Sequence, residues 1–505
     1  MMLSKLFESD NKLKPEDDDG NIEYKLRLDS KDGTGHKKLV SQMKWRLNQG
    51  KEYTDKYEAH YVLGVFDDGT MGCLTEADLK ETKLVFDKIV ESAGCIIFNE
   101  RYHTYDTSNI YYAHVKKKPI DKKMKEIYVL FLGQWSSGKT TLISNLSYST
   151  TDNGEGRARN LIFRHEHEKI SGHTSYLKKE IIGINDGHVV NYGQGMGMNW
   201  EDVAKTSDVI INIFDTPGNI KYIKTTLYGL SATNPDHIFV VIDASYIGKD
   251  YELTKFYITY AKILNIPYTV LLSKKDTIED ELIEEIINEV KKIYEITQVV
   301  VFSNITDEGI DDIFELLKNV KKRELESKPY NMFTILETFD ITDTGVVVTG
   351  IMNSGTLEMN DHMRLIGNSK SKDVIVKSIH KKEISSEKIY AGESGALHLS
   401  SMTSNNKIPI NKNCIIVSEE CKIIPCQKFK IIVNELYFPK VSLSHKKYYI
   451  FSKNNTFNAL IKEIDIDTKT IIIITQKNIS IEDNSTCILR NDYNELYLGI
   501  ISSLV

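Results

Sequence analysis

Short, continuous apolar runs alternate with segments of helical periodicity between residues 126 and 322. Continuous apolar strands suit a sheet that is covered on both faces, and helical stretches between them favour parallel β-α-β units. We therefore predict a doubly wound α/β domain over residues 126–322, with ligands at the carboxyl ends of its strands. The predicted strands are residues 127–132, 209–214, 238–242, 268–272 and 299–302.

The pattern changes after about residue 327. Helical periodicity disappears, and short apolar runs such as 333–336, 345–348 and 374–379 are separated by Gly, Asn and Asp turns. Many short strands with turn residues between them are typical of β-barrels. We predict two barrels, over residues 327–420 and 425–505.

The residues before the α/β domain predict a small α/β N-terminal domain over 21–118. Residues 60–66 and 110–115 are expected to be strands, and Thr75 is a suitable N-cap for a helix that ends near Gly94. Residues 1–20 are poor in apolar side chains and end in an acidic cluster, so we expect a mobile tail. The lysine-rich residues 116–125 are interpreted as a solvated linker in preference to an RNA contact.

Composition limits the class of protein. The 505 residues suffice for several domains, and 41% hydrophobic against 27% charged residues is ordinary for globular chains. The formal net charge of −7 argues against a protein that clamps DNA by charge alone. The six cysteines are scattered, and no apolar run approaches the roughly 20 residues that span a bilayer. We expect a monomeric, cytoplasmic protein that binds neither DNA nor membrane.

A phosphate-binding loop follows the first strand of the α/β domain and precedes a helical stretch that includes Thr141. In this pattern the glycines let backbone N–H groups converge on the β-phosphate, the lysine neutralises β- and γ-oxygens, and the hydroxyl of Thr140 binds Mg²⁺. A chance Gly-Lys-Thr sequence would lack this strand and helix. The loop consists of Gly133, Gln134, Trp135, Ser136, Ser137, Gly138, Lys139 and Thr140.

Three further motifs lie at strand ends and predict a guanine nucleotide. Asp215 and Gly218 are the first and last residues of an Asp-Thr-Pro-Gly motif. The Asp215 carboxylate is expected to hold Mg²⁺, and the Gly218 N–H is expected to sense a γ-phosphate. In Ser273-Lys274-Lys275-Asp276, the Asp276 carboxylate can accept hydrogen bonds from guanine N1–H and the 2-amino group, which adenine lacks. Ser303-Asn304 follows the last strand, where a backbone N–H can reach the guanine O6.

With these four motifs in order, the chain resembles the translational GTPases of the elongation factor Tu class. The segments 152–165, 171–175 and 189–192 are similar to the long first switch of the GTP-binding protein 1 and 2 family. The resemblance implies a GTPase with GTP or GDP and Mg²⁺ as ligands. Carried over to this chain, Thr174 is the switch threonine that would bind Mg²⁺ in the GTP state. The resemblance also argues against a metal site at the neighbouring His165-Glu166-His167-Glu168.

The chain departs from the family pattern on the side of the site where GTP is hydrolysed. Asn219 stands where relatives carry the histidine that orients the attacking water, and an amide cannot become cationic. Trp135 replaces a small apolar residue, His173 replaces an apolar gate residue, and Ser136 replaces an aspartate. The candidate catalytic residues are thus Lys139, Thr174, Gly218 and Asn219. Binding residues are retained, so we expect GTP hydrolysis that is slow without a partner.

Three functions stay open from the sequence. The first is a ribosome-activated GTPase in tRNA delivery, ribosome rescue or RNA surveillance, with tRNA or a tRNA-mimicking protein as partner. The second is a GTP-binding switch with weak hydrolysis, and the third is a scaffold whose N-terminal domain recruits a partner. Lysines and tyrosines in the second barrel are compatible with RNA contacts or with an ordinary barrel surface. They are Tyr437, Lys440, Lys446, Lys447, Tyr448, Tyr449 and Lys453.

Overall fold

The computed structural model consists of two units, residues 1–120 and 121–505. It describes residues 7–9, 12–17, 19–28, 33–54, 57–105, 108–117, 123–193, 196–197, 199–246, 251–324, 328–341, 345–367, 371–401, 410, 414–421, 423, 426–434, 441, 447–453, 455–479 and 481–503.

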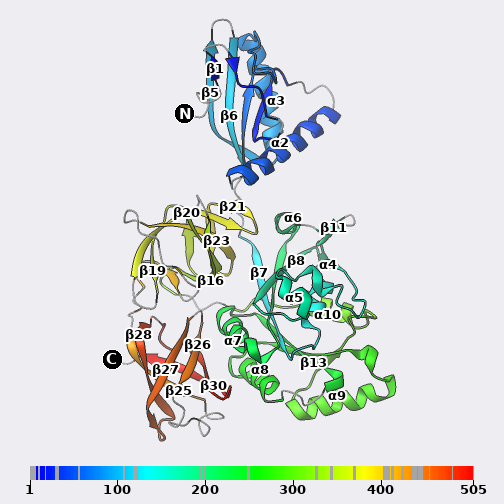
Figure 1. The fold of residues 1–505 in the computed structure, drawn as a ribbon, viewed down its shortest axis with the longest axis vertical. Coiled ribbons are helices and arrows are strands. Elements are labelled where there is room, and N and C mark those ends of the chain that lie inside the picture. Colours follow the sequence, from blue (N-terminus) through cyan, green and yellow to red (C-terminus); the bar gives the residue numbers. More distant parts are fainter. Residues whose placement is uncertain are drawn as a thin grey trace. The chain divides into compact units, whose positions relative to one another are not determined.

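The N-terminal unit is a four-stranded sheet in the order β3-β4-β6-β5 with two helices on one face (Figure 1). Its elements are β1 (Phe7–Ser9), β2 (Lys12–Leu13), β3 (Ile22–Lys25), α2 (Gly33–Thr54), β4 (Glu58–Leu63), α3 (Glu76–Ser92), β5 (Cys95–Tyr105) and β6 (Ser108–Lys117). The predicted helix starts at a capping box between Thr75 and Asp78, and Gly94 follows its end with φ 70°. The sequence analysis missed α2, β3 and β5.

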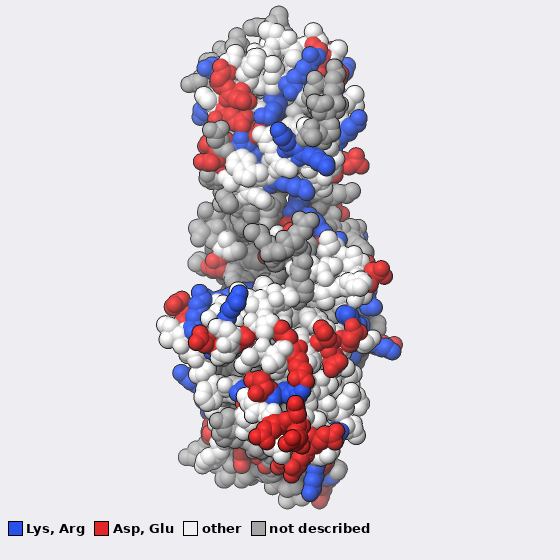
Figure 2. All heavy atoms as spheres, turned by 90° about the vertical axis from the view of Figure 1, so that its right-hand side faces the viewer, with Lys and Arg blue, Asp and Glu red and all other residues white. Residues whose placement is uncertain are grey.

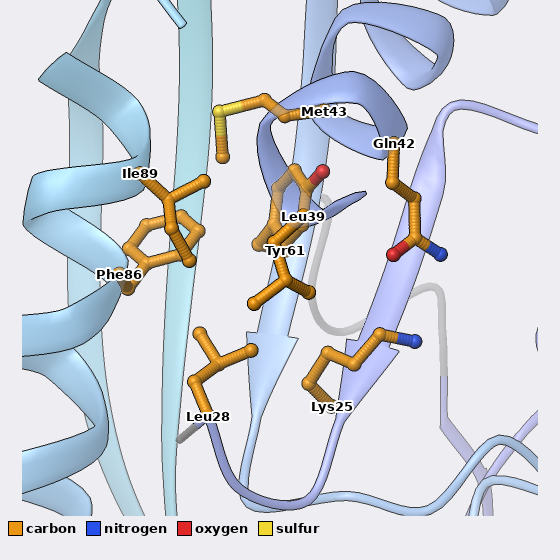
Figure 3. Close-up of a pocket in the computed structure, with 8 residues that line it drawn as sticks. All are labelled: Lys25, Leu28, Leu39, Gln42, Met43, Tyr61, Phe86 and Ile89. Atoms are coloured by element: carbon orange, nitrogen blue, oxygen red, sulfur yellow. The ribbon is translucent and has the colours of Figure 1, made fainter. Parts of the chain in front are cut away.

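The helices cover one face of this sheet, and their core contains Met43 of α2, Phe86 of α3 and Tyr61 of β4. A gap of about 10 Å³ remains between these elements (Figure 3). Such a volume holds at most one water molecule, so it is a packing gap and not a ligand site.

The expected mobile acidic tail is wrong for the described residues between 12 and 20. Leu13 is fully buried against the helix-free face of the sheet, together with Tyr24 and Val62. Glu16 forms an ion pair with the buried Arg46 of α2, whose guanidinium also donates to the carbonyl of Asp17 at 2.8 Å. A buried guanidinium needs such partners, so Glu16 and the backbone at Asp17 are part of the folded unit, whereas the Asp17 and Asp19 side chains are exposed.

The second unit begins with an α/β domain whose central sheet has the order β15-β14-β13-β7-β12-β8-β9. Its strands are β7 (Lys125–Gly133), β8 (Lys178–Asn185), β9 (His188–Val189), β12 (Val209–Asp215), β13 (His237–Asp243), β14 (Tyr268–Ser273) and β15 (Val299–Val301), with a hairpin of β10 (Tyr192–Gly193) and β11 (Met196–Gly197). Its helices are α4 (Lys139–Tyr148), α5 (Glu166–Ser171), α6 (Trp200–Thr206), α7 (Ile223–Ala232), α8 (Tyr251–Ile263), α9 (Asp280–Tyr294) and α10 (Ile310–Lys318), and its 3₁₀ turns are η1 (Arg159–Leu161), η2 (Ile220–Tyr222), η3 (Ala244–Tyr246) and η4 (Lys275–Thr277).

Alternate residues of β7 enter two different cores. Tyr128, Leu130 and Leu132 pack with α7, α8 and α9, whereas Ile127 and Val129 pack with α4 and α10 on the other face. The doubly wound sheet is therefore confirmed, and each of the five predicted strands overlaps an observed one. The sequence analysis missed β8, which runs antiparallel to β12 and extends the sheet beyond the parallel strands.

Two closed barrels follow. The strands of the first region are β16 (Met332–Ile341), β17 (Gly345–Ser354), β18 (Thr356–Glu358), β19 (His362–Ile366), β20 (Ser371–Lys381), β21 (Ile384–Ser386), β22 (Lys388–Tyr390), β23 (Ser394–Ser401) and β24 (Ile415–Val417). Pairing of β19 with β20 closes this barrel. The second barrel has the order β25-β28-β27-β26-β29-β30, from β25 (Cys426–Val433), β26 (Tyr448–Ser452), β27 (Asn455–Asp465), β28 (Thr470–Ile479), β29 (Thr486–Arg490) and β30 (Leu496–Ser503).

A buried polar contact joins the α/β domain to the first barrel. Glu126 of β7 is completely buried and accepts hydrogen bonds from Lys382 Nζ and Ser394 Oγ, both at 2.8 Å. Burial is the largest influence and by itself raises the pKa of Glu126, but the charges of Lys382 and Lys179 and the hydrogen bonds from Lys382 and Ser394 together lower this pKa to about 2. Separating the two domains would leave buried charges unpaired, which is costly.

Candidate functional site

The phosphate-binding loop connects the end of β7 to the start of α4, as its motif predicts. Gly133 has φ 146°, and a Cβ atom there would lie 2.1 Å from the Val241 carbonyl oxygen of β13. Gly138 caps α4 in the left-handed conformation, with φ 82°. The backbone conformation therefore requires glycine at both positions. In this conformation the first N–H groups of α4 face the loop, where an anion can bind.

Lys139 is buried at the first position of α4. Its Nζ donates to the carbonyl oxygens of Gly133 at 3.0 Å and Gln134 at 2.7 Å, so the lysine closes the loop upon itself. Burial lowers the pKa of Lys139 to about 8, although the nearby Asp215 carboxylate opposes this shift. The ammonium group therefore lies in a poorly solvated place where the oxygens of a polyphosphate would be good substitutes for water.

The three predicted Mg²⁺ ligands lie together although they come from distant parts of the chain. Thr140 Oγ1 is 2.6 Å from Thr174 Oγ1 and also 2.6 Å from Asp215 Oδ2, and Thr174 Oγ1 is 3.3 Å from the same carboxylate oxygen. Asp215 Oδ1 is buried and has no hydrogen-bond partner in the described part of the chain. Burial raises the pKa of Asp215, while the Thr140 hydroxyl acts in the opposite direction. A buried carboxylate with an unpaired oxygen beside two hydroxyls fits Mg²⁺, which prefers oxygen ligands.

The residues predicted to recognise guanine surround Asp276 at the end of β14. Ser303 Oγ donates to Asp276 Oδ1 at 2.5 Å, while the Asp276 side chain is otherwise exposed. Lys274 has φ 64° and pairs with Asp243 at 2.6 Å. Asn304 donates to the carbonyl oxygen of Gly138 at 3.2 Å, which connects the predicted base side to the phosphate loop.

One pocket of about 320 Å³ lies between these motifs. It is lined by Trp135, Ser136, Ser137, Gly138, Lys139, Thr140, Thr141, Asp152, Gly154, Arg159, Ser171, Gly172, His173, Thr174, Gly218, Asn219, Lys274, Asp276, Thr277, Asn304 and Ile305. Five predicted binding residues do not line it: Gly133, Gln134, Asp215, Ser273 and Ser303. Of these, Gln134, Asp215, Ser273 and Ser303 are buried and support the residues that do.

The sequence analysis did not select several lining residues as site residues, notably Asp152 and Arg159. Arg159 packs against Gly156 and Gly172, because a Cβ atom at either glycine would lie within 3.1 Å of its guanidinium. Both residues belong to the first-switch segment, whose resemblance to relatives was the available signal. Switch residues reach the pocket by tertiary folding, so spacing alone does not identify them.

Asn219, Trp135, His173 and Gly218 lie on the side of the pocket where the sequence predicts that GTP is hydrolysed. The side-chain oxygen of Asn219 accepts from the N–H of Lys221 at 2.9 Å and thereby caps η2. Trp135 is 53% exposed, and its ring meets His173 edge-to-face with the centroids 5.0 Å apart. At Gly218 a Cβ atom would lie 2.5 Å from the Gln134 carbonyl oxygen, which keeps the Gly218 backbone close to the phosphate loop.

Other candidates from the sequence have different outcomes. His165 and His167 stack with their centroids 5.3 Å apart, but they belong to no cluster of three metal-ligating side chains in the described residues. In the second barrel, Tyr448 is buried, Lys453 pairs with Glu482 and Lys447 lies over the Tyr449 ring. Tyr437, Lys440 and Lys446 lie outside the described residues. Among the helices that are described, none is long and apolar enough to cross a membrane.

Comparison with known proteins agrees with this geometry. Residues 124–323 match the family described as the elongation factor Tu GTP binding domain. GTP-binding protein 2 of Mus musculus is 28% identical over 462 residues, which cover 83% of this chain and 75% of the relative. GTP-binding protein 1 of Xenopus laevis is 26% identical over 460 residues, covering 83% of this chain and 68% of the relative.

A solved structure supports the fold beyond the α/β domain. The Ski7 GTPase-like domain of S. cerevisiae, bound to GTP, aligns with a TM-score of 0.61 at 15% identity. The alignment covers 76% of this chain and 98% of that domain, so the α/β domain and the barrels share its fold. Residues 124–323 therefore form an elongation factor Tu-type GTP-binding domain, and the chain is similar over most of its length to GTP-binding proteins 1 and 2.

Proposed function

We propose that this chain is a GTP-binding GTPase of the translation-factor type, which acts on the ribosome in tRNA delivery, ribosome rescue or RNA surveillance. The observation that carries the proposal is the meeting of Thr174, from the first switch, with Thr140 and Asp215. A ligand that binds these three oxygens orders the switch segment, and its loss releases the segment. The name of the elongation factor Tu family supports a role in translation.

The motif residues around the pocket are proposed to bind different parts of the nucleotide. The N–H groups of the loop and Lys139 bind the phosphates, and Asp276 selects guanine. Mg²⁺, held by Thr140, Thr174 and Asp215, would supply charge neutralisation of the phosphate oxygens. The Gly218 N–H is proposed to bind the γ-phosphate, because the Gly218 backbone packs against the phosphate-binding loop at Gln134.

Hydrolysis is proposed to be slow without a partner. The Asn219 oxygen already accepts from the Lys221 N–H, so one lone pair of this oxygen and the NH₂ group remain to orient an attacking water. Water-orienting groups contribute on the order of 10² to 10⁴-fold to such reactions. The capped Asn219 also favours a second candidate function, a GTP-binding switch that occupies its partner and hydrolyses GTP weakly.

Single-turnover GTP hydrolysis, with and without ribosomes, distinguishes the two functions. Acceleration by ribosomes, with little change in Asn219→Ala, supports a ribosome-activated GTPase whose water is oriented by another group. Turnover that stays near the uncatalysed rate under both conditions supports the weakly hydrolysing switch. Rapid hydrolysis that is lost in His173→Ala and retained in Asn219→Ala would refute a weakened catalytic site, since His173 would then have replaced the missing histidine.

Arg159 offers one internal source of positive charge at the pocket. It lines the cavity and is held against Gly156 and Gly172, whereas Arg157 two residues before it is exposed to solvent. An arginine beside the γ-phosphate stabilises the charge of the transition state. We expect Arg159→Ala to slow single-turnover hydrolysis at least tenfold, about 1.4 kcal/mol, and Arg157→Ala to leave it unchanged. Equal rates in the two variants would exclude this role.

A further inference from the structure

The N-terminal unit contains a second cluster of chemically active side chains, on the sheet face that the helices leave open. Glu58 and His60 are two residues apart on β4, so both side chains point to the same face. His114 of β6 lies directly opposite His60 in the antiparallel register. Their neighbours Ala59, Tyr61 and Ala113 point to the opposite face, into the helix-covered core.

The three side chains lie close enough to share one ligand. One donor atom from each lies within 4.8 Å of the donor atoms of the other two, and this is the one such group of three in the described parts of the chain. His114 Nε2 is 3.1 Å from Glu58 Oε2. The His60 and His114 rings stack with their centroids 4.5 Å apart. Ligands around a tetrahedral zinc ion are roughly 3.4 Å apart, so small side-chain movements suffice to bring the set around an ion.

We propose that Glu58, His60 and His114 form a binding site for a divalent transition metal of the zinc class. Two imidazoles and one carboxylate are a known donor set for zinc, in which three protein ligands leave a fourth position for water or another group. Imidazole ligands favour zinc, copper, iron or nickel over Mg²⁺ and Ca²⁺, which prefer oxygen. The site is separate from the nucleotide pocket in sequence and in ligand chemistry.

The groups around the cluster orient the ligands as a metal site requires. His60 Nδ1 is 2.8 Å from the Tyr112 hydroxyl. A ligating histidine commonly donates its second ring N–H to a neighbour, which fixes its tautomer.

A lysine on the neighbouring strand packs against an aromatic ring. Lys116 lies opposite Glu58 on β6, but its Nζ is held 3.4 Å from the centre of the Phe98 ring. Glu58 and His114 are 14% and 16% exposed, so an ion has access from solvent, while His60 lies deeper. The competing explanation is that His60 only stacks on His114 and that His114 only pairs with Glu58. This explanation predicts that the cluster has no affinity for a metal ion.

The test is zinc binding by the full chain after removal of metals with a chelator, in the presence of GDP and Mg²⁺. We expect one Zn²⁺ per chain with a Kd of about 1 μM or tighter, measured by calorimetry and native mass spectrometry. His60→Ala and His114→Ala are expected to weaken binding at least 100-fold. Glu58→Gln, which is nearly isosteric, should weaken it at least tenfold without disturbing the fold. Co²⁺ should give the intense visible absorption of a four-coordinate site, and this absorption should disappear in the same variants.

The matched control is His362→Ala, which removes an exposed histidine of the first barrel. Zinc affinity should be unchanged in it. Unchanged GDP affinity and circular dichroism show that each variant is folded. Either of two results would overturn the proposal: no zinc binding tighter than about 10 μM by the natural chain, or full affinity retained in Glu58→Gln and His114→Ala.

Discussion

Replacing Asp276 by Asn tests the assignment of guanine recognition most directly. Two charge-assisted hydrogen bonds from guanine to the carboxylate are lost, each worth about 1.5–3 kcal/mol. Asp276 is exposed to solvent in the free protein, so the lower value applies, and the loss is about 3 kcal/mol, or roughly 10²-fold in the Kd of GTP.

The position of Ser303 predicts which nucleotide the variant accepts. Because Ser303 donates to Oδ1 of Asp276, the amide oxygen of the substituted side chain should keep that place, and its NH₂ group should replace Oδ2. That NH₂ group repels the 2-amino group of guanine but donates to the 2-oxygen of xanthine. We therefore expect Asp276→Asn to bind XTP more tightly than GTP.

Calorimetry with GTP, XTP and ATP measures these affinities, and Glu281→Gln, an exposed carboxylate on α9, serves as the control for loss of charge. Figure 2 shows that acidic side chains gather where α9 lies, so a general charge effect needs this control. The control should keep GTP affinity within a factor of about two. Unchanged GTP affinity in Asp276→Asn, or equal losses in both variants, would refute the reasoning.

Three further predictions concern the phosphate side of the pocket. Tryptophan emission should differ between the GTP and GDP states, and Trp135→Phe should abolish the difference, because this half-exposed indole lies in the phosphate loop. GTP binding should take up protons at pH 8.5 and weaken above about pH 8, because the pKa of Lys139 in the free protein is about 8 and bound phosphates raise it. Gly218→Ala should weaken GTP binding at least tenfold and GDP binding less, since its methyl group would lie 2.5 Å from the Gln134 oxygen.

Each of these expectations has a contrary result. Emission that still responds to nucleotide in Trp135→Phe would place the sensitive indole elsewhere. Proton uptake that is equal at pH 7 and pH 8.5, measured by calorimetry in buffers of different ionisation heat, would exclude a lysine with a lowered pKa. Equal losses of GTP and GDP affinity in Gly218→Ala would indicate damage to the loop itself and not to the sensing of the γ-phosphate.

The sequence by itself determined the α/β domain and the strand ends that carry the nucleotide motifs. Buried parallel strands must be apolar along their whole length, and glycine is needed where the backbone turns with positive φ, so Gly138 and the runs around it are visible as local patterns. The Thr75 cap was visible for the same reason, because a capping hydroxyl acts on a backbone N–H three residues away.

Features that depend on contacts between residues far apart in the sequence became visible only in the tertiary structure. Glu16 belongs to a segment that the sequence predicts to be a mobile tail, whereas the structure pairs its side chain with the buried Arg46. The approach of Arg159 to the pocket follows from how its segment folds back on the phosphate loop. Glu58, His60 and His114 are ordinary residues in the sequence, and they form a donor set because strand register places residues 56 positions apart side by side. Local patterns encode backbone conformation, whereas long-range pairing assembles sites.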